Sequence, residues 1–445
     1  MAEDVMQKIV SLCKRRGFVF PAGEIYGGMG AAYDYGPYGA QLKKNIKDTW
    51  WKCNVERRTD VVGLDAAIIQ MQEVFEASGH LAGFNDTLVD CKECKHRFRI
   101  DHLVQIDEKN YKCQNCDKII NTDVCPPRKF NLMLKTELGV VEGAMKPGFL
   151  RPETAQGIFV NFANVNNSMH MKLPFGIAQI GKSFRNEVTT KSFIFRTREF
   201  EQMEIEYFVA PEEADAAYEA WVDRRFRFYT EELGIKAENL SKRPHAQDEL
   251  AHYAKGCTDI EYKFPWGFAE LEGIAHRADY DLTQHAKHSG EKLEYLDPYT
   301  NKKFTPFVIE PSAGVDRTLL AVLCDAYAEE QVKDETRVVL RFSPKIAPVK
   351  CAIFPLLKNK PELVAFAKKM HADLSEDFIV GYDEGNIGKM YRRQDEVGTP
   401  YCVTVDFTTL EDGTVTVRDR DSMEQIRIAA SSMDSFLREK IKGKK

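Results

Sequence analysis

Polar and apolar positions alternate along residues 200–207, and a period of two predicts a β-strand. The apolar side of this strand would face a core, whereas the other side places an aromatic ring among carboxylates. An amphipathic surface hairpin and an active-site hairpin would both show this pattern. The first side carries Met203, Ile205 and Tyr207 with Glu201, and the second carries Phe200, Gln202, Glu204 and Glu206.

Residues 37–54 show the longer spacing of an amphipathic helix. Large residues recur there every four positions, at Tyr38, Leu42, Ile46 and Trp50. A strand is expected next, over residues 61–69. The apolar face of the helix would pack either inside its own subunit or against a second copy of the chain.

Residues 307–310 also read as a strand, and an apolar run begins at residue 318. Between them, Pro311 to Arg317 contains Pro and Gly, so we expect the strand to turn there into a helix. The N-terminus of a helix favours anions. Arg317, about one turn inside, would reach a phosphate bound there.

Residues 211–264 are mostly helical in pattern. Their Arg224, Arg225 and Arg227 would either contact RNA or form a solvated helix face. Beyond residue 344, strands and helices alternate, which is typical of a separate α/β domain. Its expected strands are 349–357, 378–382 and 401–406, and its expected helices are 362–374 and 388–396.

Composition limits the possible function classes. The 445 residues leave room for two or three domains, and 43% hydrophobic with 29% charged residues is typical of soluble globular proteins. Apolar runs are short and the first residues carry acids, so we expect a cytoplasmic protein with no membrane partner. The net charge of −6 means that any RNA contact must come from local patches.

Four of the eleven cysteines form two Cys-x2-Cys pairs, Cys91/Cys94 and Cys113/Cys116, separated by 18 residues. Two such pairs suit tetrahedral Zn²⁺ on thiolates and predict a structural zinc ribbon over residues 85–130. Free buried cysteines rarely occur as two pairs of this kind. The Gly-rich run 27–30 lacks the flanking signals of a phosphate-binding loop, and a turn is the better interpretation.

Several motifs together resemble one enzyme family. FRNE at 184–187 with Arg-x-x-x-Phe at 196–200 resembles motif 2 of class II aminoacyl-tRNA synthetases, and GVDR at 314–317 resembles motif 3. Within that class the chain is similar to the dimeric glycyl-tRNA synthetases. The narrower similarity rests on YDYGP (33–37), RPETAQG (151–157) and EPSAG (310–314).

The resemblance implies an α+β fold, a class II antiparallel sheet flanked by helices. The catalytic domain would span 1–343, interrupted by the zinc ribbon at 85–130 and a helical insertion at 211–264 that reaches toward the tRNA acceptor stem. A C-terminal α/β anticodon-binding domain would span 344–445. The helix and strand at 37–69 would correspond to motif 1, which forms the homodimer interface in this class.

The resemblance also implies an activity, the ATP-dependent attachment of glycine to tRNA(Gly) through a glycyl-adenylate, with release of pyrophosphate and AMP. Arg185 would bridge the glycine carboxylate and the α-phosphate, and Arg317 would hold the outer phosphates with Arg196; Arg185 and Arg317 are the expected catalytic residues. Phe200 would stack on adenine. The complete expected ATP set is Arg185, Asn186, Glu187, Phe195, Arg196, Phe200, Glu270, Leu271, Gly314, Asp316 and Arg317.

Mg²⁺ takes few protein carboxylates and relies on phosphates for its other ligands. Glu270 is the candidate ligand, and an exposed strand glutamate is the alternative interpretation. Glu270 and Glu272 are expected to share one face of a strand.

Glycine offers no side chain, so its affinity must come from its ammonium and carboxylate groups. Glu153, Glu204 and Glu310 would surround the ammonium, and alanine would be excluded by lack of room rather than by editing. The expected glycine-binding set is Arg99, Glu153, Phe200, Gln202, Glu204, Glu310, Ser312 and Gly314.

Three other functions compete with this one. A structural zinc protein with no enzymatic role would explain residues 91–116 but nothing else. A synthetase-derived binding protein would lose the ATP-binding arginines, yet they are present here. A synthetase for threonine, serine or proline would share motifs 2 and 3, but the three glutamates and EPSAG argue against it.

Overall fold

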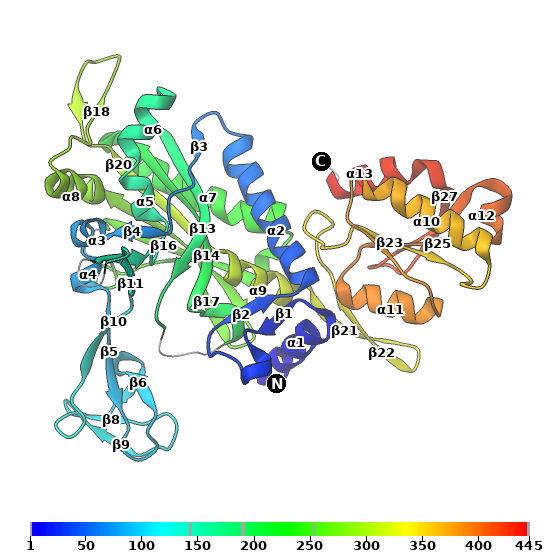
Figure 1. Ribbon diagram of the computed structural model, residues 1–445, viewed down its shortest axis with the longest axis horizontal. Helices are drawn as coiled ribbons and strands as arrows, with labels where there is room; N and C mark the ends of the chain where they lie inside the picture. Colours follow the sequence, from blue (N-terminus) through cyan, green and yellow to red (C-terminus); the bar gives the residue numbers. More distant parts are fainter. Residues whose placement is uncertain (1, 142–144, 188–191, 252–253, 443–445) are drawn as a thin grey trace.

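The computed structural model describes residues 2–141, 145–187, 192–251 and 254–442. Its centre is a seven-stranded sheet (Figure 1) in which all neighbours run antiparallel except the edge strand β3, which is parallel to β13. The α+β fold class is therefore confirmed. In spatial order the strands are β15 (Leu240–Pro244), β16 (Gly256–Phe264), β17 (Gly267–Ala278), β20 (Phe307–Gly314), β14 (Glu199–Val209), β13 (Phe175–Phe184) and β3 (Val61–Gly63).

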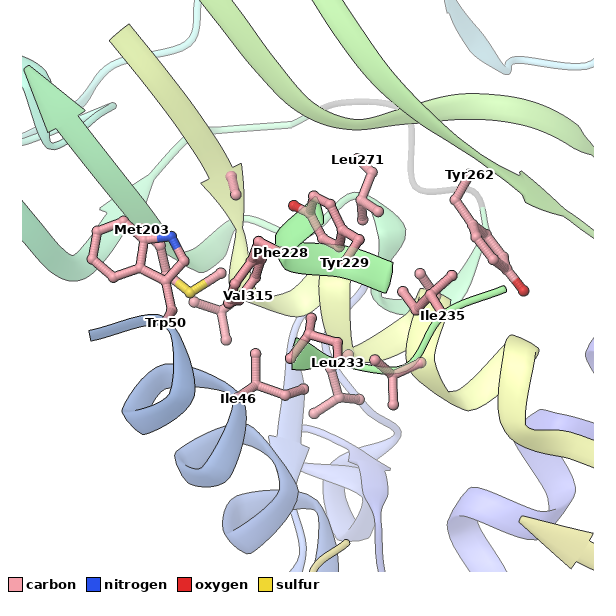
Figure 2. Packing of buried hydrophobic residues seen from close by; sticks show 14 of the residues in the cluster. Ile46, Trp50, Met203, Phe228, Tyr229, Leu233, Ile235, Tyr262, Leu271 and Val315 are labelled. Carbon is pink, nitrogen blue, oxygen red and sulfur yellow. The ribbon is translucent and has the colours of Figure 1, made fainter. Parts of the chain in front are cut away.

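One face of this sheet is covered by α2 (Pro37–Trp51), α7 (Ala214–Arg227) and α9 (Val315–Ala326). Met203 and Ile205 of β14 belong to this core, as the alternation along the strand predicts. Figure 2 shows Met203 beside Trp50 of α2, with Tyr229 and Leu271 in the same cluster. The buried side of the hairpin therefore faces helices of the same chain.

The opposite face is covered at one end only. Helices α5 (Ala155–Phe159), α6 (Phe162–Met169) and α8 (Tyr280–Ser289) contribute to a smaller apolar cluster that includes Phe175 and Phe208 of the sheet. The remainder of that face carries polar side chains and forms the floor of a cavity. The fold thus leaves part of one sheet face open to a cavity.

The apolar face of α2 is buried within its own subunit. Leu42 and Ile46 are fully buried and Trp50 is 1% exposed, packed against the central sheet. This apolar face therefore packs inside its own subunit, and a dimer interface elsewhere on residues 37–69 stays a prediction. The helix ends in a π-helical turn, Lys52–Glu56, and the strand expected over 61–69 is two short strands, β3 and β4 (Ile69–Met71).

The expected helical insertion at 211–264 is helical in its first part only. Helix α7 is followed by β15 and β16, which belong to the central sheet. The pairing of β15 with β16, and of β16 with β17, fixes these residues as strands, whatever their local pattern. Arg225, expected either at RNA or in solvent, is fully buried.

Strand β20 is longer than its Pro and Gly residues predict. It runs through Pro311 to Gly314, and α9 begins at Val315. The strand is hydrogen-bonded on both sides, to β14 and β17, and this pairing overrides the local turn signals.

Two small three-stranded sheets project from the catalytic body at the lower left of Figure 1. They form the segment expected to be a zinc ribbon. The strands are β10 (Arg128–Asn131), β5 (Asn85–Asp90) and β6 (Arg97–Arg99) in one sheet, and β7 (Val104–Gln105), β8 (Asn110–Lys112) and β9 (Ile119–Asn121) in the other.

The C-terminal part has its own sheet and apolar cluster, and lies at the right of Figure 1. Helices α10 (Pro361–Ser375) and α13 (Met433–Lys442) pack on one face and α11 (Ile387–Val397) on the other. The sheet order is β24 (Val380–Tyr382), β23 (Cys351–Pro355), β25 (Tyr401–Val405), β26 (Thr414–Asp419) and β27 (Gln425–Ala429). The boundary at 343/344 stays a prediction.

Buried Arg337 of β22 (Glu335–Leu340) links the C-terminal part to the rest of the chain. Its Nε donates to Asp395 of α11 at 2.8 Å, and Arg418 Nη1 donates to the same carboxylate at 2.9 Å.

The remaining elements are α1 (Ala2–Arg16), β1 (Val19–Pro21), β2 (Tyr33–Tyr35), α3 (Gln72–Ala77), α4 (His80–Gly83), β11 (Leu134–Leu138), β12 (Lys146–Leu150), β18 (Tyr295–Leu296), β19 (Lys303–Phe304), β21 (Tyr327–Val332) and α12 (Phe407–Asp412).

None of the helices in the described ranges has the length and apolar character needed to cross a lipid bilayer.

Candidate active site

The register of three strands builds the floor of the cavity. Glu204 of β14 lies opposite Ser312 of β20, which in turn lies opposite Gly273 of β17. In the next row, Glu310 lies opposite Ala275. Because Gly273 and Ala275 have almost no side chain, the floor is hollow beside the carboxylates, and the cavity has a volume of about 340 Å³.

Most of the residues predicted from the sequence meet in this one cavity, although they come from distant parts of the chain. The order of strands in the sheet, rather than sequence proximity, brings them together. The predicted residues that line it are Glu153, Arg185, Glu187, Phe195, Arg196, Phe200, Gln202, Glu204, Glu270, Glu310, Ser312, Gly314, Asp316 and Arg317.

Three predicted residues do not line the cavity. Arg99 pairs with Asp86 at 3.0 Å and with Asp101 at 2.7 Å, both in the ribbon segment. Asn186 has its backbone N–H bonded to the carbonyl of residue 132. Leu271 is 1% exposed and belongs to the core on the other side of the sheet.

The three predicted ammonium ligands are held by neighbouring side chains. Ser312 Oγ donates to Glu204 at 2.6 Å, and the Thr154 hydroxyl donates to the same carboxylate. Glu153 accepts from Gln156 Nε2 at 3.0 Å, and a guanidinium nitrogen of Arg277 donates to Glu310. The carboxylates are thus fixed in place around a hollow.

Crowding of these acids in a buried site separates their pKa values. Burial opposes the ionisation of Glu153, but His80 at 3.3 Å and Arg277 lower its pKa. Burial and the Glu153 charge raise the pKa of Glu204. Burial also raises the pKa of Glu310 to about 8, although Arg277 acts in the opposite direction. A cation that enters the site would lower these raised pKa values, so Glu204 and Glu310 would release protons to solvent and bind the cation as carboxylates.

Glu206 was not predicted as a site residue. Its side chain is fully buried, and neither carboxylate oxygen has a hydrogen-bond partner among the described residues. Its carboxylate lies within 4.8 Å of those of Glu204 and Glu310. Burial and the Glu310 charge raise the pKa of Glu206 well above its ordinary value. The alternation along β14 placed Glu206 on this face, and that was the available signal.

We expect Glu206→Gln to remove a pH dependence of stability. Between the ordinary pKa of glutamate, about 4.3, and the raised pKa in the fold, Glu206 is ionised in the unfolded chain but protonated in the folded one. The free energy of unfolding of the wild-type protein then falls as pH rises through the folded pKa, by up to about 1.4 kcal/mol per pH unit. Urea denaturation at several pH values measures this slope. The control Glu219→Gln, on the exposed side of α7, should keep it.

Two arginines lie over aromatic rings at the rim of the floor. Arg185 lies 5.2 Å from the ring centre of Phe200, and its Nε donates to the Pro152 carbonyl at 3.0 Å. Arg317 lies 4.5 Å from the ring centre of Phe195. Both guanidinium groups are therefore oriented beside the cavity before any ligand is bound.

Asp316 is held by three donors. Lys43 Nζ lies 2.7 Å from Asp316, the backbone N–H of Glu201 donates to it at 2.8 Å, and the Tyr35 hydroxyl donates to the same carboxylate. The carboxylate is thus already paired at the start of α9, and its contact with ATP stays a prediction. Tyr35, the second tyrosine of YDYGP, therefore holds the Asp316 carboxylate.

Glu270 and Glu272 do not share a face, contrary to the prediction. Glu261 of β16 pairs with Glu270 and Ile260 pairs with Glu272, so Leu271 is an extra residue, a β-bulge. Glu270 lines the cavity, 3.0 Å from Arg317, which lowers its pKa. Glu272 faces the opposite side of the sheet. The bulge therefore re-aims one carboxylate into the core.

The four ribbon cysteines converge on one point. Cys91 Sγ lies 3.7 Å from Cys116 Sγ, Cys94 Sγ lies 3.6 Å from Cys113 Sγ, and all four sulfurs lie within 4.8 Å of one another. Such a set fits a tetrahedral Zn²⁺. The four cysteines would hold the ion as a structural centre with no open position.

Replacing one of these ligands should unfold the ribbon. We expect Cys113→Ser to lose about one equivalent of zinc and the order of residues 85–130, because metal binding supplies the folding free energy of such small units. Metal analysis and hydrogen exchange of the ribbon measure both effects. Cys53→Ser, at a half-buried cysteine outside the cluster, should retain the zinc.

Comparisons with known proteins agree with this architecture. Residues 146–326 match the family model described as "tRNA synthetase class II core domain (G, H, P, S and T)", and residues 350–440 match "Anticodon binding domain". A glycine–tRNA ligase of Borreliella burgdorferi is 52% identical over 98% of this chain and 97% of its own length. Glycine–tRNA ligases of Clostridium acetobutylicum (52%; 99% of both chains) and Treponema denticola (51%; 99% of this chain and 98% of the relative) are equally similar.

These alignments cover nearly the whole chain, from the central sheet through the ribbon to the C-terminal part. The chain belongs to the glycine–tRNA ligase family of class II aminoacyl-tRNA synthetases.

Proposed function

We propose that this protein attaches glycine to tRNA(Gly) in two steps, through a glycyl-adenylate, in the cytoplasm. The observation that carries the proposal is the hollow bordered by Glu153, Glu204 and Glu310 beside Arg185. Three carboxyl groups around a small space suit an ammonium group, and the adjacent guanidinium suits a carboxylate. Together they fit an amino acid that has no side chain.

In the first step, a carboxylate oxygen of glycine attacks the α-phosphorus of ATP, and the bond to the bridging oxygen of pyrophosphate breaks. The glycine carboxylate is already ionised near neutral pH, so no general base is needed. Arg185 would hold the attacking carboxylate and the α-phosphate in line, and Arg317 with Arg196 would hold the outer phosphates. In the second step, a terminal ribose hydroxyl of the tRNA attacks the glycyl carbonyl carbon and AMP leaves.

Mg²⁺ bound with ATP would neutralise charge on the phosphates. Glu270 is the candidate protein ligand, since its carboxylate lies in the cavity beside Arg317. Phe200 and Phe195 present rings at the rim, and Phe200 is the proposed partner of adenine.

The test of this function is amino-acid-dependent ATP–pyrophosphate exchange without tRNA, run with each standard amino acid. Exchange with glycine alone is the expected result. Exchange with a different amino acid would refute the assignment of the carboxylate hollow. Absence of exchange in the folded, zinc-loaded protein would favour a binding protein derived from a synthetase.

Glu204→Gln should raise the KM for glycine by about 10- to 100-fold, because a charge-assisted hydrogen bond to a buried ammonium is worth about 1.5–3 kcal/mol. Glu199→Gln on the same strand is the matched control, since Glu199 is exposed and pairs with Lys182 away from the cavity. Equal glycine affinity in both variants would refute the ammonium role of Glu204.

The proposed macromolecular partners are tRNA(Gly), bound in part through residues 344–445, and a second copy of the chain. An apolar patch of the sheet β4–β12–β11 supports dimerisation. Ile69 and Met71 are 46% and 65% exposed, and Leu138 is 43% exposed. A Cβ added to Gly148 would lie 2.8 Å from Leu138 and 3.2 Å from Ile69, so these side chains adjoin.

Light scattering on a size-exclusion column tests this interface. We expect a dimer for the wild-type chain and a monomer for Met71→Glu combined with Leu138→Glu, because charges buried at an apolar contact oppose association. The exposed pair Ile119→Glu and Val124→Glu, in the ribbon, is the control and should leave the dimer intact.

A further inference from the structure

One wall of the same cavity carries three metal-ligating side chains that the proposed chemistry does not use. Cys257 and Asp259 are two positions apart on β16 and therefore face the same side, toward the cavity. His245 follows β15, the neighbouring strand, and also lines the cavity. An imidazole, a thiol and a carboxyl group thus meet at one place.

The geometry of these groups suits a first-row transition metal. His245 Nε2 lies 2.8 Å from Asp259 Oδ2, and Cys257 Sγ lies 4.0 Å from Asp259 Oδ1. One ligand atom from each residue lies within 4.8 Å of the others. Ligands of a tetrahedral zinc ion are about 3.5 Å apart. The set therefore needs only small rotations to close around an ion.

The neighbouring residues would allow Asp259 to exchange its ion pair with Arg243 for a bond to a metal ion. Asp259 is 5% exposed and also accepts from Arg243 at 3.2 Å. Arg243 has Glu249 at 3.0 Å and Glu261 at 3.1 Å as alternative anions, and its side chain is 41% exposed. Arg243 can therefore leave Asp259 without becoming an unpaired buried charge.

We propose that His245, Cys257 and Asp259 form a second metal site for Zn²⁺ or a similar transition metal, with its fourth coordination position open to the cavity. Three protein ligands of mixed N, S and O type with an open position differ from the closed four-cysteine set of the ribbon. Cys257 would bind the ion as a thiolate, so metal binding would displace the thiol proton.

The site lies close enough to the ammonium hollow to affect it. Asp259 lies opposite Gly273, and Gly273 lies opposite Ser312, so two strand spacings, about 10 Å, separate the two groups. A divalent cation at this distance opposes an ammonium in the same cavity. This expectation rests on the proposed function. A metal ion bound at His245, Cys257 and Asp259 should raise the KM for glycine several-fold, so the metal site would be inhibitory.

Cobalt binding tests the site without reference to activity. Protein whose ribbon is loaded with zinc is titrated with Co²⁺, and absorption from thiolate-to-cobalt charge transfer is recorded. We expect a further equivalent of Co²⁺ to bind with this absorption in the wild-type chain and in the control Cys53→Ser. Cys257→Ser should lose the absorption, and His245→Gln should weaken binding at least about tenfold.

Two results would overturn the site. One is that no Co²⁺ binds beyond the amount that displaces ribbon zinc, and the other is that the absorption survives Cys257→Ser. Exchange assays with and without added Zn²⁺ then address the effect on glycine. If enzyme with zinc in the ribbon only, supplied with Mg²⁺ and ATP, shows no glycine-dependent exchange, the proposed function fails while the metal site stands on the cobalt titration.

Discussion

Arg185→Lys is expected to lower kcat/KM for glycine-dependent ATP–pyrophosphate exchange by about 100- to 1,000-fold, or about 2.7–4 kcal/mol, the usual cost of losing one preorganised donor at a developing charge. The planar guanidinium can contact two anions at once, whereas an ammonium is a single point charge. Its orientation is set in advance, because Nε donates to the Pro152 carbonyl at 3.0 Å and the guanidinium lies 5.3 Å and 5.2 Å from the ring centres of Phe84 and Phe200. Lysine can reproduce the charge but not this orientation.

The matched control for this variant is Arg97→Lys in the ribbon. Arg97 is exposed and pairs with Asp90 at 2.6 Å. It does not line the cavity. We expect exchange by this variant to equal that of the wild-type enzyme. Exchange by Arg185→Lys within about threefold of wild type would instead assign the in-line alignment to another group.

The sequence predicted those parts of the site that depend on local pattern. Alternation along 200–207 placed Glu204 and Phe200 on the cavity side and Ile205 on the core side, as the structure has them. The spacing of the four cysteines anticipated the cluster at Cys91 to Cys116. The family and the α+β fold class are confirmed, because the motifs that carry them are short and contiguous. The roles of individual cavity residues stay predictions.

Features set by pairing between distant segments were not predicted. The extension of β20 through Pro311 depends on hydrogen bonds to β14, about a hundred residues upstream, and to β17, several tens of residues upstream. No local sequence pattern contains this information. The same is true of the strand β16, expected to be helical. Burial of α2 against its own sheet likewise depends on where α7 and α9 pack. Sequence periodicity identifies an apolar face but not its partner.

The β-bulge at Leu271 is the sharpest example of this limit, and it makes a second large effect measurable. A strict period of two would aim Glu270 and Glu272 at the same side. The bulge instead buries Glu272, where its carboxylate accepts from Arg225 Nε of α7 at 2.6 Å with both side chains fully buried. Arg225 Nη1 also donates to Asn54 at 3.1 Å. This ion pair joins the cavity strand to the helix that covers its other face.

Glu272→Ala is therefore expected to lower the free energy of unfolding by about 3–5 kcal/mol, because it leaves the Arg225 guanidinium buried without its counter-charge. Glu270→Ala, two residues away, is the matched control. Its side chain is 50% exposed and its pairing with Arg317 contributes about 0–1 kcal/mol to stability. Urea denaturation of the two variants compares them directly.

Activity should separate the two variants in the opposite direction. Glu270→Ala is expected to keep its fold and lose exchange activity, with a changed dependence on Mg²⁺ concentration, because its carboxylate lies in the cavity. Glu272→Ala, assayed at low temperature where it is folded, should keep the Mg²⁺ dependence of the wild-type enzyme. Equal stability losses in the two variants would contradict the bulge, since they would place both carboxylates in the same environment. A Mg²⁺ dependence unchanged in Glu270→Ala would remove that residue from the proposed metal–ATP contacts while leaving the ion pair of Glu272 intact.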